Sequence, residues 1–161
     1  MAFQMKIAVG SDHAGFALKK KIIEYLTENG FDIEDVGTYS SESTDYPLYA
    51  FKVGEAVRDK RADFGVLVCY TGIGMSISAN KVKGVRAALC YDVRAAGLAR
   101  RHNDANIICL GANFIDSQKL PAILSAFLNN DFEGRTEGGK RHNRRVKIIA
   151  KYEEDSCKHK E

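Results

Sequence analysis

The stretch of sequence that decides the fold is FGVLVCYTGIG, residues 64–74. Its first half is a short, continuous apolar run, which is typical of a strand buried on both faces of a parallel sheet. The run ends at Cys69, and the glycines at 72 and 74 then allow a tight turn. A buried strand that passes through a glycine turn into a helix is the repeating unit of an α/β fold.

The same unit recurs along the chain. Segments of strand length occupy residues 6–10, 31–36, 64–69, 85–90 and 106–110; they are mainly apolar, except that the acidic residues of 31–36 predict a strand near an edge of the sheet. Helical spacing of apolar residues predicts a first helix that ends at Asn29-Gly30, and further helices at about 48–60, 75–81, 93–101, 117–129 and from about 141. This alternation predicts a three-layer α/β/α, doubly wound, Rossmann-like fold: a five-stranded parallel sheet with a C-terminal tail helix. The strand order stays open.

Length and composition limit the class of protein. The 161 residues fit a single domain, 1–161, in which we expect the charged end, about 150–161, to fray. The apolar runs are strand-sized and the start, MAFQMK, lacks the pattern of a signal peptide. Cysteines at 69, 90, 109 and 157 form no CxxC pair. We therefore expect a soluble cytoplasmic protein with reduced thiols, no metal site and no membrane segment.

Positive charge gathers near the C-terminus, although the net charge is only +3. The run KRHNRRVK, residues 140–147, is either a solvated helix face or a local anion site. Arg141 and Arg145 are one helical turn apart, so they could hold the same phosphate. A non-catalytic module that binds nucleic acid through this run is an alternative, but the run lacks the aromatic residues that stack on bases.

Ligands of doubly wound folds lie beyond the carboxyl ends of the strands. That rule selects the loops at 11–13, 69–74, 91–92 and 111–113. In the second loop, Cys69 meets free backbone N–H groups, which favour a thiolate and can hold an anionic oxygen. Proton removal beside a carbonyl needs both features. The alternatives are a small buried hydrophobe and a turn that serves only packing.

Three further positions carry candidate chemistry. Asp12 and His13 open the first helix, where His13 would suit a phosphate and Asp12 could instead be an N-cap. His102 precedes the fifth strand and is either a surface residue or a proton shuttle. Tyr46, before Pro47, either offers its hydroxyl to a sugar or shapes the turn.

Five motifs, in the same order, resemble the type B ribose-5-phosphate isomerase family, which also includes the galactose-6-phosphate isomerase subunits. They are GSDHAGF (10–16), TDYP (44–47), CYTGIGMSISANK (69–81), RHNDAN (101–106) and RHNRRV (141–146). The resemblance runs from Lys6 to about Ile149, which is nearly the whole chain.

The resemblance implies an aldose–ketose isomerase, free of metal and cofactor, that interconverts D-ribose 5-phosphate and D-ribulose 5-phosphate through an enediolate in the non-oxidative pentose phosphate pathway. It implies that Cys69 moves the proton between C1 and C2, and that His102 opens the sugar ring with help from Asp12. Thr71 begins the loop that holds the enediolate. The other implied substrate contacts are His13, Tyr46, Tyr70, Gly72, Ile73, Gly74, Asn103, Arg141 and Arg145.

Family members are dimers or tetramers whose active sites combine residues of two subunits, so the resemblance implies a homodimer or homotetramer. Tyr70 replaces the glycine usual after the catalytic cysteine, and Asn113 stands where some members carry a phosphate-binding arginine. Another branch uses a glutamate base at the position of Met75, which leaves that role here to Cys69. Allose 6-phosphate and galactose 6-phosphate remain alternative substrates within the family.

Overall fold

The computed structural model describes residues 4–158. They form a parallel five-stranded sheet of β1 (Lys6–Ser11), β2 (Asp32–Asp35), β3 (Phe64–Cys69), β4 (Ala87–Leu89) and β5 (Ile107–Gly111), in the order β2-β1-β3-β5-β4. The chain moves from β1 outward to β2 and then returns to the other side of β1 to form β3. The crevice between the carboxyl ends of β1 and β3 is therefore the switch point at which such folds bind ligands.

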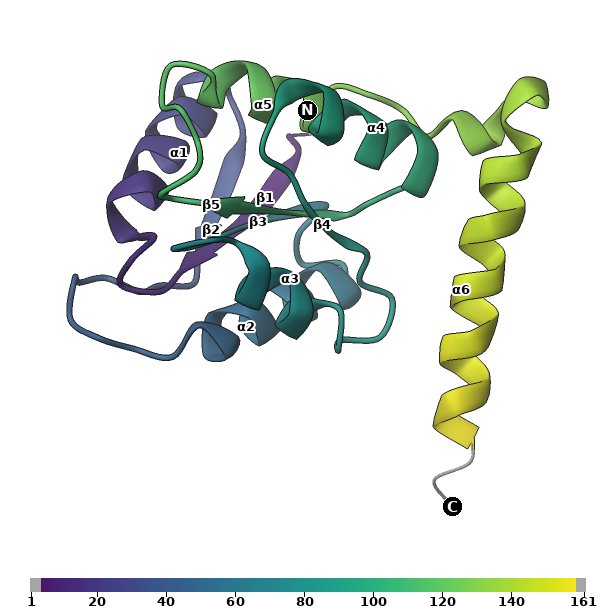
Figure 1. The fold of residues 1–161 in the computed structure, drawn as a ribbon, viewed down its shortest axis with the longest axis horizontal. Helices are drawn as coiled ribbons and strands as arrows, with labels where there is room; N and C mark the ends of the chain where they lie inside the picture. Colours follow the sequence, from purple (N-terminus) through teal and green to yellow (C-terminus); the bar gives the residue numbers. More distant parts are fainter. Residues whose placement is uncertain (1–3, 159–161) are drawn as a thin grey trace.

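Helices cover both faces of this sheet (Figure 1). One face carries α1 (Phe16–Glu28), α4 (Val93–Asn103) and α5 (Leu120–Leu128), and the other carries α2 (Tyr46–Arg58) and α3 (Ile73–Ala79). Each face has its own apolar core: Ile22, Ile108 and Phe127 belong to the first, and Val53, Leu67 and Met75 belong to the second. The predicted three-layer fold is confirmed.

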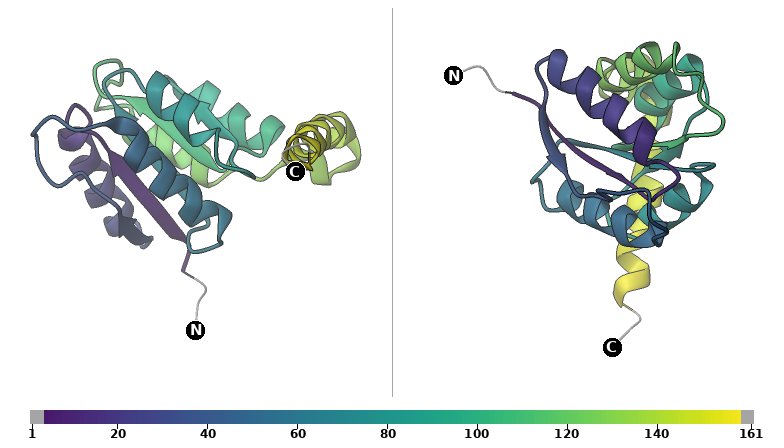
Figure 2. Two further views of the ribbon diagram at one scale, coloured as in Figure 1. Left: turned by 90° about the horizontal axis from the view of Figure 1, so that it is seen from below. Right: turned by 90° about the vertical axis from the view of Figure 1, so that its left-hand side faces the viewer.

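The last helix, α6 (Lys140–Lys158), lies at the side of the sheet, as two views from other directions also show (Figure 2). Two short 3₁₀ turns, η1 (Glu133–Arg135) and η2 (Glu137–Gly139), lead into it. Further along α6, the carboxylate of Glu153 accepts a hydrogen bond of 2.9 Å from the N–H of Gly84. That bond ties the helix to the loop before β4.

Some boundaries differ from the sequence prediction. Residues 150–158, which we expected to fray, are helical; residues 159–161 lie outside the described part. The strand predicted at 85–90 is shorter, because the backbone N–H of Arg86 bonds to the Asn106 side chain at 2.8 Å. The helix predicted from 117 begins at Leu120, because Asp116 organises a separate turn by accepting from the N–H of Gln118.

Within residues 4–158, every helix is too short or too polar to cross a lipid bilayer.

Candidate active site

The turn after β1 brings Asp12 to the switch point. Asp12 is 6% exposed, and its Oδ1 accepts a hydrogen bond of 3.0 Å from the N–H of Gly15, which precedes α1. The turn packs tightly on β3, since a Cβ built on Gly15 would lie 2.5 Å from the carbonyl oxygen of Val68. The hydrogen bond from Gly15 gives Asp12 a structural role close to the N-cap role that the sequence offered as an alternative. The same turn also places Asp12 beside the end of β3.

The turn after β3 places a backbone donor on the thiol. Cys69, the last residue of β3, is 4% exposed, and its Sγ accepts a hydrogen bond of 3.1 Å from the N–H of Gly72. Gly72 has a φ of +79°, and a Cβ there would lie 2.9 Å from the carbonyl carbon of Leu110. Only glycine suits both constraints. The hydroxyl of Thr71 accepts from the N–H of Ile73 at 3.1 Å, which closes the loop.

The turn after β1 also supplies an imidazole, which the loop before α2 holds in place. His13 Nδ1 accepts a hydrogen bond of 3.2 Å from the N–H of Thr44. The same nitrogen lies 3.3 Å from the carbonyl oxygen of Thr44, so these two contacts hold the Nδ1 side of the ring and leave Nε2 available to an anion. The Tyr46 ring lies against the backbone of Gly74, where an added Cβ would come within 2.6 Å of it.

Tyr49 also belongs to this region, and the sequence did not single it out. Its hydroxyl lies 2.9 Å from Thr44 Oγ1. Hydrogen bonds with Thr44 and then Thr38 lower the pKa of Tyr49 below its usual value. Its spacing of three from Tyr46 in the first turn of α2 is the signal that could have found it.

Aromatic side chains surround the Tyr70 position. The rings of Tyr70 and Phe114 meet edge to face with centroids 6.4 Å apart, and those of Tyr91 and Phe114 are 5.6 Å apart. The hydroxyl of Tyr91 donates to the carbonyl of Thr71 at 3.0 Å. Asn113 donates its backbone N–H to the carbonyl of Tyr70 at 3.1 Å. Both departures from the family pattern therefore occupy one aromatic patch beside the turn after Cys69.

The structure thus brings together most of the predicted residues. We call this group the carboxyl-edge site: Asp12, His13, Tyr46, Cys69, Tyr70, Thr71, Gly72, Ile73 and Gly74.

The other predicted residues lie elsewhere. His102 and Asn103 end α4, which runs back from the carboxyl edge toward the start of β5. Because Gly65 pairs with Ile107 and Cys69 with Gly111, the two edges are separated by about 13 Å of strand. Within one chain, His102 and Cys69 therefore belong to opposite edges of the sheet.

A compact cluster surrounds His102. Its ring stacks on that of His142, with centroids 4.2 Å apart and planes inclined by 11°. Its Nε2 lies 3.5 Å from Glu133 Oε2. Arg141 and Arg145 stand in the first turns of α6, on either side of His142 in sequence. We call this group the histidine corner: His102, Asn103, Glu133, Arg141, His142 and Arg145.

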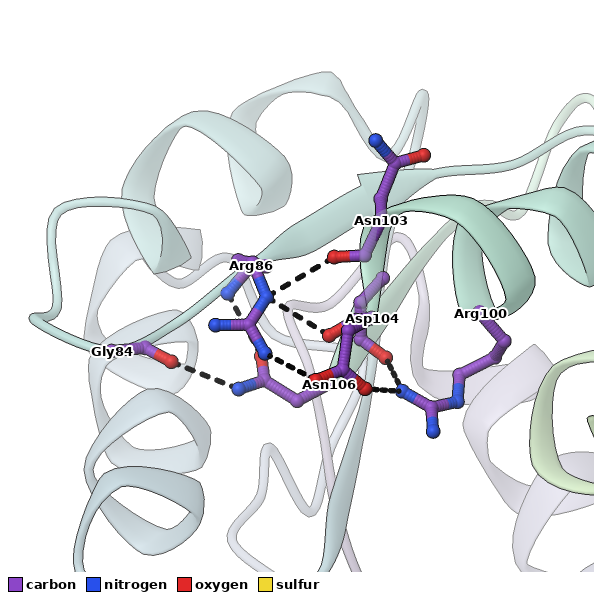
Figure 3. A network of polar contacts seen from close by, with 7 residues as sticks. Gly84, Arg86, Arg100, Asn103, Asp104 and Asn106 are labelled. Atoms are coloured by element: carbon purple, nitrogen blue, oxygen red, sulfur yellow. Dashed lines mark hydrogen bonds and ion pairs between the residues drawn. The ribbon is translucent and has the colours of Figure 1, made fainter. Parts of the chain in front are cut away.

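A polar network holds the chain that follows His102 (Figure 3). Arg86 donates from Nε to the carbonyl oxygens of Asn103 and Asp104, at 3.2 and 2.9 Å. The Asp104 carboxylate also pairs with Arg86 and with Arg100, whose side chain is 7% exposed. This network fixes the end of α4, and with it the position of His102.

The histidine corner also contains a candidate cation site. Ligand atoms of His102, Glu133 and His142 lie within 4.8 Å of one another, a grouping that the sequence analysis did not expect. The nearly parallel rings direct their nitrogen lone pairs side by side rather than toward one point. Arg101 also donates to Glu133 Oε1 at 2.6 Å. Both features suit a hydrogen-bonded cluster better than tetrahedral coordination.

The comparisons with known proteins identify the family of this chain. A family model described as ribose/galactose isomerase matches residues 7–149. Ribose-5-phosphate isomerase B of Escherichia coli is 43% identical over 149 residues, which cover 92% of this chain and 97% of the relative.

Solved structures give the same result. A ribose-5-phosphate isomerase B from Clostridium thermocellum has a TM-score of 0.89 at 41% identity, covering 94% of this chain and 99% of that one. The enzyme of Mycoplasma genitalium, solved with bound ribulose-5-phosphate, has a TM-score of 0.85 at 41% identity, covering 93% of this chain and 97% of the other. The chain belongs to the ribose/galactose isomerase family.

Proposed function

We propose that this protein is an aldose–ketose isomerase that interconverts D-ribose 5-phosphate and D-ribulose 5-phosphate through an enediolate. One observation carries the proposal: at the switch point of the sheet, the Cys69 sulfur accepts a hydrogen bond from the loop that follows it. The relatives named above, which match almost the full chain at about 40% identity, support the same activity.

The proton transfer uses the carboxyl-edge site. The Cys69 thiolate takes the proton from C2 of the open-chain aldose, and the C–H electrons form the C1–C2 double bond while O1 becomes negative. Backbone N–H groups of this loop that bond neither to Cys69 nor to Thr71, such as that of Gly74, stabilise that oxygen. The thiol then returns the proton to C1, a proton passes from O2 to O1, and the carbonyl re-forms at C2. Thr71 begins the loop whose amides serve this step.

Ring opening precedes that transfer, because ribose 5-phosphate in solution is mainly a furanose. We assign it to His102, whose imidazole can exchange a proton with the sugar, with Asp12 assisting from the other side. His13, Arg141 and Arg145 hold the phosphate, and Tyr46 and Asn103 contact the sugar hydroxyls. Charge-assisted bonds from arginine to phosphate are among the strongest such contacts.

These assignments require a second copy of the chain, because one chain holds the two groups at opposite edges of its sheet. The side of the sheet near α6 supports such an assembly. A groove of about 720 Å³ runs between the β4 edge and α6, with Ala87, Ile149 and Tyr152 among its lining residues. Ile148, Ile149 and Tyr152 are more than half exposed on α6. The proposed homodimer covers these apolar side chains and combines the histidine corner of one copy with the carboxyl-edge site of the other.

Substrate length is the finer part of the proposal. Tyr70, with Phe114 and Tyr91 packed beside it, fills space next to the catalytic turn that a glycine would leave open. A narrower site favours a five-carbon over a six-carbon sugar phosphate. We further place the enzyme in the cytoplasm and in the non-oxidative pentose phosphate pathway; its four free cysteines are in keeping with a reducing compartment.

A turnover assay tests the proposal. The purified protein is given ribose 5-phosphate, allose 6-phosphate and galactose 6-phosphate in parallel, and the ketose product is measured. We expect the highest kcat/KM with ribose 5-phosphate. A higher value with either hexose phosphate would reassign the substrate, and no turnover of any of the three would reject the isomerase. Light scattering on the same sample measures the oligomeric state, and a monomer would contradict the shared site.

A further inference from the structure

The ring of His102 stacks on the ring of His142, which is buried and makes few hydrogen bonds. His142 is 5% exposed, and its Nε2 has no hydrogen-bond partner within residues 4–158. The two rings are stacked 4.2 Å apart and almost parallel. In this arrangement, the face of the His142 ring packs against the face of the His102 ring and fixes the plane of the His102 ring.

Glu133 restricts the rotation of the His102 ring within that plane. Its Oε2 lies 3.5 Å from His102 Nε2, while its Oε1 accepts a hydrogen bond from Arg101 Nε. The hydrogen bond from Arg101, followed by the positive charges of Arg101 and His102, lowers the pKa of Glu133. Glu133 is therefore a fixed anion at neutral pH, and it favours one rotation of the His102 ring.

The backbone holds Glu133 in place. Gly139, at the end of η2, packs so closely on η1 that a Cβ there would lie 1.8 Å from the carbonyl oxygen of Glu133. No other residue would fit without moving this turn. The sequence pattern around residues 133–139 therefore fixes the carboxylate relative to the end of α4.

The charges around His142 keep the two rings from repelling each other. Burial, followed by the positive charges of Arg141 and His102, lowers the pKa of His142, and Arg145 acts in the same direction while Glu133 opposes it. His142 is therefore neutral at pH 7. The other ring of the pair, His102, can carry a proton without a charged ring stacked on it.

We propose that Glu133 and His142 are positioning residues for His102 in the ring-opening step: the stacked ring fixes the plane of His102 and the carboxylate fixes its rotation. The proposal rests on the proposed isomerase function. A purely structural clamp, in which Arg101 and Glu133 only fasten η1 to α4, is the competing explanation. The clamp would affect every substrate equally, whereas a positioning role affects only a sugar that must be opened.

The test compares E133Q, H142A and H142F with the wild type. The substrates are ribose 5-phosphate and 4-deoxyribose 5-phosphate, which lacks the hydroxyl that closes the furanose ring. We expect E133Q and H142A to lower kcat for ribose 5-phosphate about tenfold, as loss of an orienting partner commonly does, with KM little changed. With the ring-free sugar, the loss should stay within about twofold. H142F keeps a flat ring and should recover most of the loss seen in H142A.

The matched control is E137Q. Glu137 lies in the neighbouring 3₁₀ turn, is exposed, and pairs with Lys140 rather than with His102. E137Q should behave as the wild type with both sugars. Thermal unfolding monitored by circular dichroism confirms that each variant is folded, and E133Q tests the proposal even if H142A does not fold.

Two results would overturn the positioning role alone: equal losses with both sugars in an otherwise active enzyme, or no loss in either E133Q or H142A. A wild type that turns over neither sugar would overturn the isomerase function and the positioning role together. The two failures are therefore distinguishable.

Discussion

The carboxyl-edge site and the histidine corner are built in different ways. The first is made mainly of turns that directly follow strands, and the contacts that hold its carboxylate and its thiol span only a few residues, from Gly15 to Asp12 and from Gly72 to Cys69. The second joins the end of α4, the turn η1 and the first turns of α6, so its contacts span about 30 to 40 residues of sequence. Local backbone geometry shapes one region, and tertiary packing shapes the other.

The chemistry of the two regions is complementary. The carboxyl-edge site holds a thiol, the backbone N–H groups of the turn after Cys69 and a carboxylate, which suit carbanion chemistry. The histidine corner holds stacked imidazoles and arginines, which suit proton exchange with a ring oxygen and phosphate binding. Neither region alone contains a complete isomerase site, so variants in each should fail in different ways.

The largest effect should come from Cys69→Ala. Removing the base should lower kcat by about 10² to 10⁴, because a positioned general base contributes that much to the rate. The loss should be the same for ribose 5-phosphate and for 4-deoxyribose 5-phosphate, since both need the proton moved. Turnover assays on both sugars measure it, and a variant with near-normal turnover would remove the proposed base.

His102→Asn should separate the two regions. We expect a fall of about 10² in kcat for ribose 5-phosphate, at the low end for a lost acid or base. With 4-deoxyribose 5-phosphate the fall should be several times smaller, because that sugar has no furanose to open. Parallel losses with the two sugars would argue against a ring-opening role.

Asp104→Asn should loosen the histidine corner while leaving the carboxyl-edge site intact. It removes the charge that pairs with Arg100, whose side chain is 7% exposed, and with Arg86. Because the substitution leaves the buried Arg100 without its charged partner, the free energy of unfolding should fall by about 3 kcal/mol, as measured by urea denaturation.

The control for that variant is Asp155→Asn. Asp155 pairs at 3.5 Å with Lys151, whose side chain is 78% exposed, on the surface of α6. Loss of such an exposed pair should cost less than about 1 kcal/mol. A similar cost in the two variants would mean that the network around Asp104 adds no more than a surface pair.

The smallest effect should be a pH dependence confined to the histidine corner. The pKa of His142 is lowered, chiefly by burial and then by the charges of Arg141 and His102. The unfolded chain, with an ordinary histidine near pH 6.5, therefore binds more protons than the folded one between the two pKa values. His142 thus contributes stability that is present above about pH 6.5 and is lost as the pH falls through its folded pKa.

Replacement by phenylalanine removes this titration. Between pH 7.5 and pH 5, the melting temperature should fall more for the wild type than for H142F, because His102, Glu133, Arg141 and Arg145 remain in both proteins. Scanning calorimetry at the two pH values measures the difference. An equal fall in both would mean that His142 is not held neutral by its surroundings.

The two regions also differ in how far the sequence predicted them. Periodicity and the glycine turns predicted the layers of the fold and the loops that meet at the switch point, because strand ends and turns are encoded over a few residues. The sequence did not identify Glu133 or His142 as neighbours of His102, since that cluster depends on where η1 and α6 pack. It predicted loop amides beside Cys69 and a capping role as one alternative for Asp12, but it missed Tyr49.

Lys19 shows the same limit inside the core. A lysine on a helix is usually exposed to solvent, but Lys19, in α1, is 1% exposed and pairs with Asp35 at 2.5 Å. A charged residue among apolar ones on a helix can point to solvent or to a partner on another element. Only the packing of α1 against β2 decides between them.

The measurement that tests the shared site most directly is complementation between two defective chains. Cys69→Ala and His102→Asn chains are co-expressed with different tags, and the mixed dimer is isolated. One of its two sites would carry both substitutions and the other neither, so it should have about half the wild-type kcat with ribose 5-phosphate. Each homodimer should remain nearly inactive. A mixed dimer no more active than the two homodimers would contradict a site built from the carboxyl edge of one copy and the histidine corner of the other.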